Sequence, residues 1–401
     1  MKKLVATLHL WIGLASGLVV FVVAITGAIW VFSDEITALL RADATYVEPR
    51  AEKTVALDEL WQKIQSDTGT KDELWRINVF SAADRSWVFF GRKNSPEAIT
   101  YLGLVDYYDG FYVDPYSGQL LAIYDEEHDF FNVVKLLHYS LLLNFPYGKP
   151  IVGICTIIVI IMLISGIYLW WPKTKQLRRQ KFLFQWNTGT SLNRKYLDVH
   201  NILGFYISSI VLLIALTGLV FAFAWFRDLV YMAGAGTTTP QVITRVESVV
   251  GESDVEFPLD RALHHARSLH PTAELIIFSM PVNARGAIGV RVQQEEYARY
   301  VAHNLQFDQY SGKLLSSQNH TDRNLGEKLI AANYDLHIGL FFGMPGKILA
   351  FVASLFCASL PVTGFMVWWG RRSTKKRLLP AATAERARAL TGSRSGHMSS
   401  R

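Results

Sequence analysis

Four apolar runs, each long enough to cross a lipid bilayer, place the strongest limit on how this chain can fold. They lie at about 7–32, 149–171, 200–226 and 346–369 of the 401 residues. A membrane-spanning helix needs about 20 mostly apolar residues, and 50% of the chain is hydrophobic while only 18% is charged. We therefore expect a membrane α-helical protein with four transmembrane helices.

The first run follows Met1 and two lysines, so it has to be distinguished from a cleaved signal peptide. It is longer than the apolar region of a signal peptide. It also ends at Trp30 to Asp34 without a small-x-small cleavage motif. We interpret it as a retained membrane helix.

Basic residues beside the runs predict how the chain crosses the membrane. The segment 172–195 contains no acid and carries Lys173, Lys175, Arg178, Arg179, Lys181, Arg194 and Lys195. The segment after the fourth run begins with Arg371 and Arg372. Short basic segments stay in the cytoplasm, so we expect both termini there and 33–145 and 227–345 in the periplasm of a bacterium. These flanks account for the net charge of +6, so the charge does not predict nucleic-acid binding.

Two histidine-containing patterns each occur twice, which indicates an internal duplication. In the first, a histidine opens an apolar run, a glycine follows four residues later, and a Thr-Gly pair ends the run: His9, Gly13 and Gly27, then His200, Gly204 and Gly218. In the second, a histidine precedes a run that contains Ser/Thr-Gly and ends in Trp-Trp. Its two histidines are His138 and His337. The turn sequence Asp-x-Tyr-Ser-Gly also recurs, at Asp114 and Asp308.

The duplicated unit is a span, an extramembrane domain and a second span. Both copies start in the cytoplasm, so a pseudo-two-fold axis along the membrane normal should relate them. Alternating apolar residues, turn signals and an amphipathic helix predict an α+β fold for each extramembrane domain. We expect Pro146-Tyr-Gly148 to separate an interfacial helix from the second transmembrane helix. The expected segments are transmembrane helix 1 (1–32), periplasmic domain 1 (33–130), the interfacial helix and transmembrane helix 2 (131–171), a basic cytoplasmic loop (172–195), transmembrane helix 3 (196–226), periplasmic domain 2 (227–328), the interfacial helix and transmembrane helix 4 (329–370), and a cytoplasmic tail (371–401).

The four recurring histidines are the candidate cofactor-binding residues. An ionisable side chain in or beside the membrane is costly and suggests a functional role. Because the membrane core is about 30 Å thick, His9 at a cytoplasmic end cannot share a site with His138 at an outer end. The two-fold symmetry instead pairs His9 with His200, and His138 with His337. Paired neutral imidazoles can hold haem iron axially, so we predict two bis-histidine haem sites, one in each leaflet.

Small residues continue the stripe of helix surface that begins at His9 and at His200. Such residues let membrane helices approach closely. Helix packing alone explains the glycines, but it does not explain a histidine at the head of each stripe. We therefore interpret Gly13, Gly27, Gly204 and Gly218 as haem-packing residues, with Gly27 and Gly218 beside the outer macrocycle.

The remaining histidines and the two cysteines are weaker candidates. A zinc or copper site is disfavoured at either pair because no cluster of Cys, Met or carboxylate residues accompanies it, and such sites use three or four protein ligands. Cys155 and Cys357 lie inside apolar runs and are interpreted as small hydrophobic residues. Histidines without a counterpart in the other half are expected to have surface or capping roles: His128, His264, His265, His270, His303 and His320. The end of the tail, which includes His397, resembles an added tag and is left out of the site.

These motifs resemble the PepSY-associated transmembrane family, and the four-span arrangement is similar to that of its bacterial inner-membrane ferrisiderophore reductases (FoxB/PiuB-like proteins). The resemblance covers about residues 1–378 and is carried by the His-x-x-x-Gly, Thr-Gly, Trp-Trp and Asp-x-Tyr-Ser-Gly motifs. It implies two periplasmic PepSY-like domains, haem b as cofactor and a ferric siderophore as substrate. The family's span-associated histidines match His9, His138, His200 and His337.

The expected function is therefore a haem-containing reductase of the inner membrane. Electrons would enter on the cytoplasmic side and reduce Fe(III) held by a siderophore in the periplasm, releasing iron as Fe(II). No nucleotide-binding glycine motif is present in the sequence, so the electron donor is expected to be a quinol, a flavin reductase or a small reductant. Two alternatives remain open: a membrane-anchored PepSY-type module that binds proteins or regulates a protease, and a transporter of a metal or metallophore.

Overall fold

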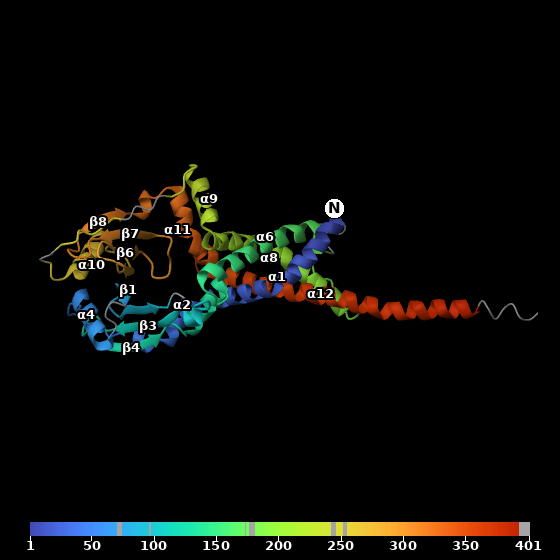
Figure 1. Ribbon diagram of the computed structural model, residues 1–401, viewed down its shortest axis with the longest axis horizontal. Coiled ribbons are helices and arrows are strands. Elements are labelled where there is room, and N and C mark those ends of the chain that lie inside the picture. The colour runs from blue at the N-terminus through green and yellow to red at the C-terminus, as the bar shows by residue number, and fades with distance from the viewer. Residues whose placement is uncertain are drawn as a thin grey trace, which may run out of the picture.

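The computed structural model of the protein describes residues 1–69, 74–95, 98–172, 174–175, 181–241, 246–251 and 255–392, and only the backbone of 373–392. A bundle of long helices joins a sheet-containing region at one end (Figure 1). Lys173, Arg178, Arg179 and His397 lie outside the described residues.

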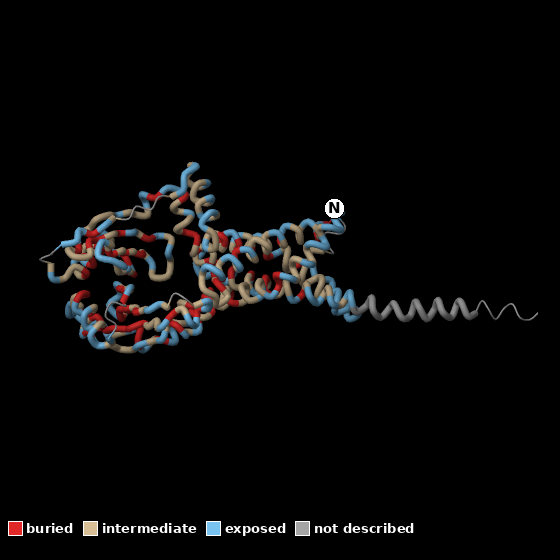
Figure 2. The backbone as a smooth tube through the Cα atoms, viewed as in Figure 1, coloured by how far each residue is buried: buried red, intermediate tan, exposed pale blue. Residues whose placement is uncertain are grey.

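Four helices have the length and composition to cross a membrane, which confirms the four predicted spans. They are α1 (Lys2–Trp30), α6 (Phe145–Trp170), α8 (Leu192–Ala222) and α12 (Gly343–Gly392), with the last span at Leu340–Arg372. Only 17% to 28% of the residues in their most apolar windows are buried inside the protein. Figure 2 accordingly shows most of the bundle as intermediate or exposed. Most of these apolar side chains therefore face outward, as lipid requires.

The sheet is a single antiparallel sheet of eight strands in the order β4-β3-β2-β1-β5-β6-β7-β8. The strands are β1 (Leu74–Phe80), β2 (Trp87–Asn94), β3 (Val105–Val113), β4 (Leu120–Asp125), β5 (Leu275–Ser279), β6 (Ile288–Gln293), β7 (Ala302–Phe307) and β8 (Leu314–Gln318). Sequence patterns predicted two extramembrane α+β domains. The structure joins them where β1 pairs with β5, from Arg76 opposite Ser279 to Phe80 opposite Leu275.

One face of the sheet packs on helices α4 (Leu57–Thr68) and α10 (Pro258–Leu269), which lie at the end of the sheet region farthest from the bundle (Figure 1). Alternate side chains of a strand point to opposite faces, so Ile77 of β1 and Phe278 of β5 both enter this core. Neither side chain is exposed. The core is shared by the two halves of the chain, because it also contains Leu60 of α4 and Leu263 of α10.

Helices α4 and α10 cap each other across the two halves. Asp58 accepts hydrogen bonds from the backbone N–H groups of Leu259 (3.1 Å) and Asp260 (2.8 Å). Asp260 in turn accepts one from the N–H of Leu57 (3.1 Å). Free N–H groups at a helix start need such acceptors, so the two carboxylates tie the halves together.

Short helices connect the sheet to the bundle. They are α2 (Ser33–Leu40), α3 (Ala42–Thr45), α5 (Phe130–Ser140), α9 (Ala224–Ala235) and α11 (Leu325–Ile338), with single 3-10 turns η1 (Tyr101–Gly103), η2 (His320–Asp322) and η3 (Leu340–Phe342).

The break between α5 and α6 is not where the sequence predicted it. It falls at 141–144, where Leu141 and Leu142 adopt positive φ angles of 55° and 58°. Pro146 instead lies in the first turn of α6. Backbone N–H groups in this turn have no acceptor within the helix, so the missing N–H of proline costs no hydrogen bond there. In the second half, Gly339 with φ 82° ends α11 at the corresponding place.

Candidate cofactor site

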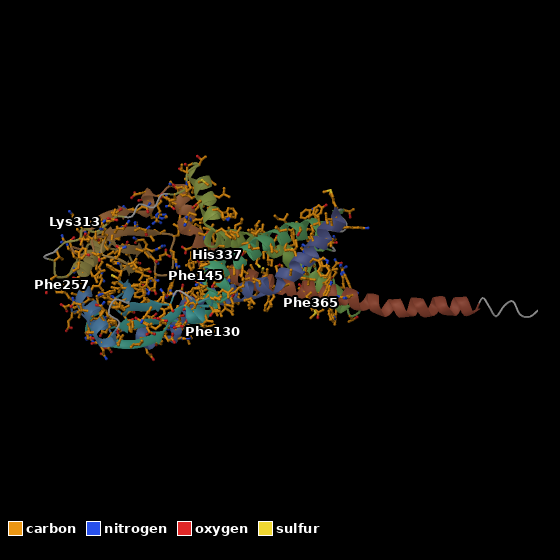
Figure 3. The ribbon with its side chains drawn as sticks, viewed as in Figure 1. Phe130, Phe145, Phe257, Lys313, His337 and Phe365 are labelled. Carbon is orange, nitrogen blue, oxygen red and sulfur yellow. The ribbon has the colours of Figure 1, made fainter. Side chains whose placement is uncertain are left out.

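The structure brings the four recurring histidines together in the predicted pairs. The rings of His9 (α1) and His200 (α8) have centroids 6.5 Å apart and planes at 86°. The rings of His138 (α5) and His337 (α11) have centroids 6.0 Å apart and planes at 64°. We call them the sheet-distal pair and the sheet-proximal pair. Figure 3 shows His337 where the bundle meets the sheet region.

The two pairs are separate sites at opposite ends of the bundle. His138 packs against Gly27 of α1, which lies 18 residues along the helix from His9, or about 27 Å at 1.5 Å per residue. The chain start, close to His9, is drawn at the opposite end of the bundle from the sheet (Figure 1). A ligand of ordinary size therefore meets one pair or the other.

Each histidine of the sheet-distal pair is held through Nδ1 by the neighbouring span of its own half. His9 Nδ1 lies 2.8 Å from Ser165 Oγ on α6. His200 Nδ1 lies 3.1 Å from both Leu360 O and Thr363 Oγ1 on α12. Because the Leu360 carbonyl can only accept, it favours a proton on Nδ1 of His200 and leaves the Nε2 lone pair available.

The sheet-proximal pair is held in the same way by α1 and α8. His138 Nδ1 lies 2.8 Å from the Val23 carbonyl oxygen, which also accepts from Thr26 Oγ1 (3.1 Å). His337 Nδ1 lies 2.9 Å from Thr217 Oγ1. Among the described residues none forms a hydrogen bond with Nε2 of either pair. Anchoring one ring nitrogen while the other stays free is how proteins orient metal-binding histidines.

Each histidine ring rests on a glycine that follows one of these hydroxyl residues. A Cβ placed on the glycine would stand 2.9 Å from His138 Cε1 at Gly27 and 3.4 Å from His337 Cε1 at Gly218. The sheet-distal equivalents are Gly166 beneath His9 and Gly364 beneath His200, both at 3.3 Å. The Ser/Thr-Gly pair is thus a seat for a histidine from another helix. The Ser/Thr-Gly signal is present in the sequence of all four spans, but it does not by itself show that Ser165 and Gly166 meet His9, or that Thr363 and Gly364 meet His200.

Gly13 and Gly204 have a different position from the one predicted by their shared stripe. A Cβ at Gly13 would stand 2.7 Å from Met162 Cε of α6, and one at Gly204 would stand 3.5 Å from Leu360 Cδ2 of α12. Both glycines face side chains of a neighbouring span. Gly27 and Gly218, by contrast, contact histidine rings directly.

Two further glycines place the short helices that carry the sheet-proximal pair. A Cβ at Gly148 of α6 would stand 2.1 Å from Ser140 O, and one at Gly346 of α12 would stand 2.1 Å from Gly339 O. No larger residue fits without moving the backbone. These contacts hold the ends of α5 and α11 against the spans, and His138 and His337 lie only two residues earlier on those helices.

The ring separations fit two imidazoles on opposite sides of one metal ion. A metal–nitrogen bond of about 2.0 Å and a nitrogen about 1.1 Å from the ring centroid put two such rings about 6.2 Å apart. The observed separations are 6.5 Å and 6.0 Å. Within the described ranges, no group of three or more His, Cys, Asp or Glu side chains is placed to hold a metal ion. Each pair therefore offers two nitrogen ligands, a number that would fit haem, because haem would bring the remaining iron ligands itself.

The sheet-proximal histidines are also in the protonation state that a metal requires. Burial lowers the pKa of His138. Burial, and then the nearby His138 charge, lowers the pKa of His337. Both rings are therefore neutral at physiological pH, and neutral imidazole is the form that binds metals.

A cavity lies between the sheet and the bundle, about one helical turn from the sheet-proximal pair. It consists of two hollows of about 400 Å³ and 260 Å³ that share lining residues such as Asp34, Asn78 and Tyr297. Trp30 lines it one turn beyond Gly27 and donates through Nε1 to Tyr334 Oη (3.3 Å). Tyr334 lies one turn before His337 on α11. The cavity thus ends one helical turn from the histidines, which the sequence had not indicated.

The remaining histidines lie outside the two pairs. His128 and His264 lie close to carboxylate oxygens on their own segments, those of Asp125 (2.8 Å) and Asp260 (3.2 Å). His270 and His303 stack with ring centroids 3.9 Å apart. The cysteines, Cys155 and Cys357, are both free.

Comparison with known proteins gives one finding. Residues 6–371, nearly the whole chain, match the family model described as the PepSY-associated TM region. No curated protein matches the chain.

Proposed function

The chain belongs to the PepSY-associated transmembrane family, and from this premise we propose that it is a haem-containing reductase of the bacterial inner membrane. It transfers electrons to a ferric siderophore in the periplasm and releases iron as Fe(II). The observation that carries the proposal is the pair geometry: two imidazoles whose ring centroids lie 6.5 Å apart at the sheet-distal end of the bundle and 6.0 Å apart at the sheet-proximal end. In each ring Nδ1 is anchored by a neighbouring helix.

His9 and His200 hold one haem b, and His138 and His337 hold the other. A bound haem supplies reversible one-electron chemistry, while the protein supplies binding, orientation and electrostatics. The hydroxyl groups of Ser165, Thr217 and Thr363 and the carbonyl oxygens of Val23 and Leu360 keep the rings in place.

The apolar interior between the pairs keeps water out of the middle of the bundle. Its buried members come from α6, α8 and α12: Leu163, Ile207, Val211, Ala353 and Cys357. A dry, low-dielectric surrounding tunes the potential of a redox cofactor and prevents side reactions.

The cavity beside the sheet-proximal pair is the place where we expect the ferric chelate to be reduced. Each Fe(III) that becomes Fe(II) takes up one electron, which a quinol, a flavin reductase or a small reductant supplies at the sheet-distal end. The basic residues that flank the spans at that end, such as Lys195 and Arg371, support its cytoplasmic placement. Fe(II) binds hard oxygen ligands less tightly than Fe(III), so reduction loosens the chelate.

The absorption spectrum of protein purified from haem-supplied cells tests this proposal, followed by a reduction assay with a chromogenic Fe(II) chelator. We expect a Soret band and Fe(II) release on addition of dithionite and a ferric siderophore. A matched control is His264→Ala, which removes an exposed histidine outside the pairs and should change neither result. A colourless preparation, or a haem protein that the ferric siderophore does not reoxidise, would refute the proposal.

A further inference from the structure

The cavity between the sheet and the bundle contains more positive charge than its own acids neutralise. Strand alternation turns Arg76 of β1 and Arg291 of β6 away from the α4/α10 core and toward this cavity, which Arg299 also lines. None of the three forms an ion pair in the part of the chain that the structure describes. They are therefore the starting point for asking what the cavity binds.

Most of the carboxylates in the cavity are already engaged. Glu126 and Asp129 both pair with Arg41, and the Asp129 contact is 2.9 Å. Glu296 forms a two-pronged pair with Arg85 at 2.6 Å and 2.9 Å. These three carboxylates therefore pair with Arg41 and Arg85, not with Arg76, Arg291 or Arg299.

Asp34 carries the fourth carboxyl group that lines the cavity, and it does not neutralise the positive charge of Arg76, Arg291 and Arg299. Burial raises its pKa, although the Arg299 charge acts in the opposite direction. A raised pKa favours the neutral acid, so Asp34 is a poor source of compensating charge.

The side-chain hydrogen bonds of Arg76 and Arg291 go to neutral acceptors. Arg76 donates from Nε to Asn78 Oδ1 (2.9 Å), and Arg291 donates to the backbone oxygen of Arg299 (2.6 Å). The buried acid Asp335 acts electrostatically on Arg291 and Arg299. Its carboxylate, however, accepts hydrogen bonds from the backbone N–H groups of Arg299 (2.9 Å) and Tyr300 (2.7 Å). Nε of Arg291 is buried and has no hydrogen-bond partner. Burial, and then the neighbouring Arg299, lowers the pKa of Arg291 to about 10. Half-buried charges such as Arg76 and Arg291, and a buried donor such as Arg291 Nε, are normally satisfied by a partner, which points to an anionic ligand.

We propose that this cavity selects an anionic ferric chelate, one that surrounds the metal with carboxylate or catecholate oxygens, over a neutral or cationic hydroxamate chelate. Planar guanidinium groups bind such oxygens in two-pronged fashion. The combined volume of the hollows is within the range of small-molecule sites. This inference rests on the proposed function for its ligand class.

One arginine of the cluster contacts a residue that lies one helical turn from the sheet-proximal pair. The guanidinium carbon of Arg299 lies 3.7 Å from the ring centroid of Tyr334. Tyr334 accepts the hydrogen bond from Trp30 (3.3 Å), and both lie about one turn from the pair. An anion held by Arg76, Arg291 and Arg299 therefore lies on the side of the cavity next to Tyr334, about one turn from the sheet-proximal pair.

Binding of redox-inert gallium(III) complexes to the full-length protein in detergent, measured by titration calorimetry, tests the inference. The probes are gallium(III) citrate, a trianionic gallium(III) tris-catecholate and an uncharged gallium(III) trihydroxamate. We expect Arg76→Gln and Arg291→Gln each to weaken binding of the two anionic complexes about tenfold or more. Binding of the trihydroxamate should stay weak and unchanged. The control is Arg227→Gln, which removes an exposed arginine of α9 that pairs with Asp228.

Equal affinity for the anionic and uncharged complexes, or no loss of affinity in Arg76→Gln and Arg291→Gln, would overturn the inference. Haem content is recorded for every variant, since arginines can also bind the propionates of a haem. Loss of haem in these variants together with unchanged chelate binding would also contradict it. Because gallium is not reduced, anion binding to a protein without haem would refute the proposed function and leave this inference standing.

Discussion

Gly27→Ala should disturb the sheet-proximal pair more than any other alanine substitution at a histidine seat. A methyl group at Gly27 would stand 2.9 Å from His138 Cε1, whereas ordinary contact begins at 3.4 Å. The ring must therefore retreat by about 0.5 Å, more than the ±0.2 Å or so that a metal–ligand distance tolerates. Overpacking of this kind costs about 1–3 kcal/mol.

Gly218→Ala provides the matched comparison. Gly218 is the equivalent glycine in the other half, and a Cβ there would stand 3.4 Å from His337 Cε1, which is ordinary contact. The better helix propensity of alanine, about 1 kcal/mol, offsets the small crowding there. Gly204→Ala on the same helix faces only a flexible leucine and serves as the control. Haem content per chain, measured from the absorption spectrum, should fall by about half in Gly27→Ala and stay unchanged in the other two. Equal haem loss in Gly27→Ala and Gly204→Ala would refute the reasoning.

Three further predictions concern the sheet region and are measured by thermal unfolding in detergent. Asp58→Ala should lower stability by about 1–2 kcal/mol because it removes two cap acceptors, while Asp67→Ala on the exposed face of the same helix should not. Arg85→Met should cost roughly 1.5–3 kcal/mol because it leaves Glu296 without its partner, and an unchanged melting temperature would contradict the structure. Burial acts to raise the pKa of Asp308, but hydrogen bonds from backbone N–H groups outweigh it and hold the pKa below its usual value. Its stabilisation should be complete above about pH 4 and lost as the pH falls through the lowered pKa, and a pH profile that Asp308→Asn leaves unchanged would contradict this.

The spans and the histidine pairs could be predicted from sequence because their signals are local and repeated. Apolar length identifies a span without tertiary information. The depth of His9 and His138 along their spans excluded a shared site and required partners from the other half. The strands near Asp114 and Asp308 were recognisable because a turn sequence separates two alternating runs.

Other features of the fold depend on which segments contact each other in the folded protein, and no local sequence pattern shows those contacts. The pairing of β1 with β5 joins two strand edges that look the same as any other edge, so two domains were predicted where one sheet exists. Pro146 was predicted to break a helix that it begins, because proline fits both positions. Arg76 is far in sequence from Arg291 and Arg299, and it meets them only when the sheet has formed.

Haem stoichiometry in single histidine variants tests the central claim most directly. A pyridine haemochrome assay on purified protein should find two haems per chain in the wild type, one in His9→Ala and one in His138→Ala. It should find none when both are replaced. Two haems in every variant, or loss of both haems from each single substitution, would contradict two independent histidine-paired sites.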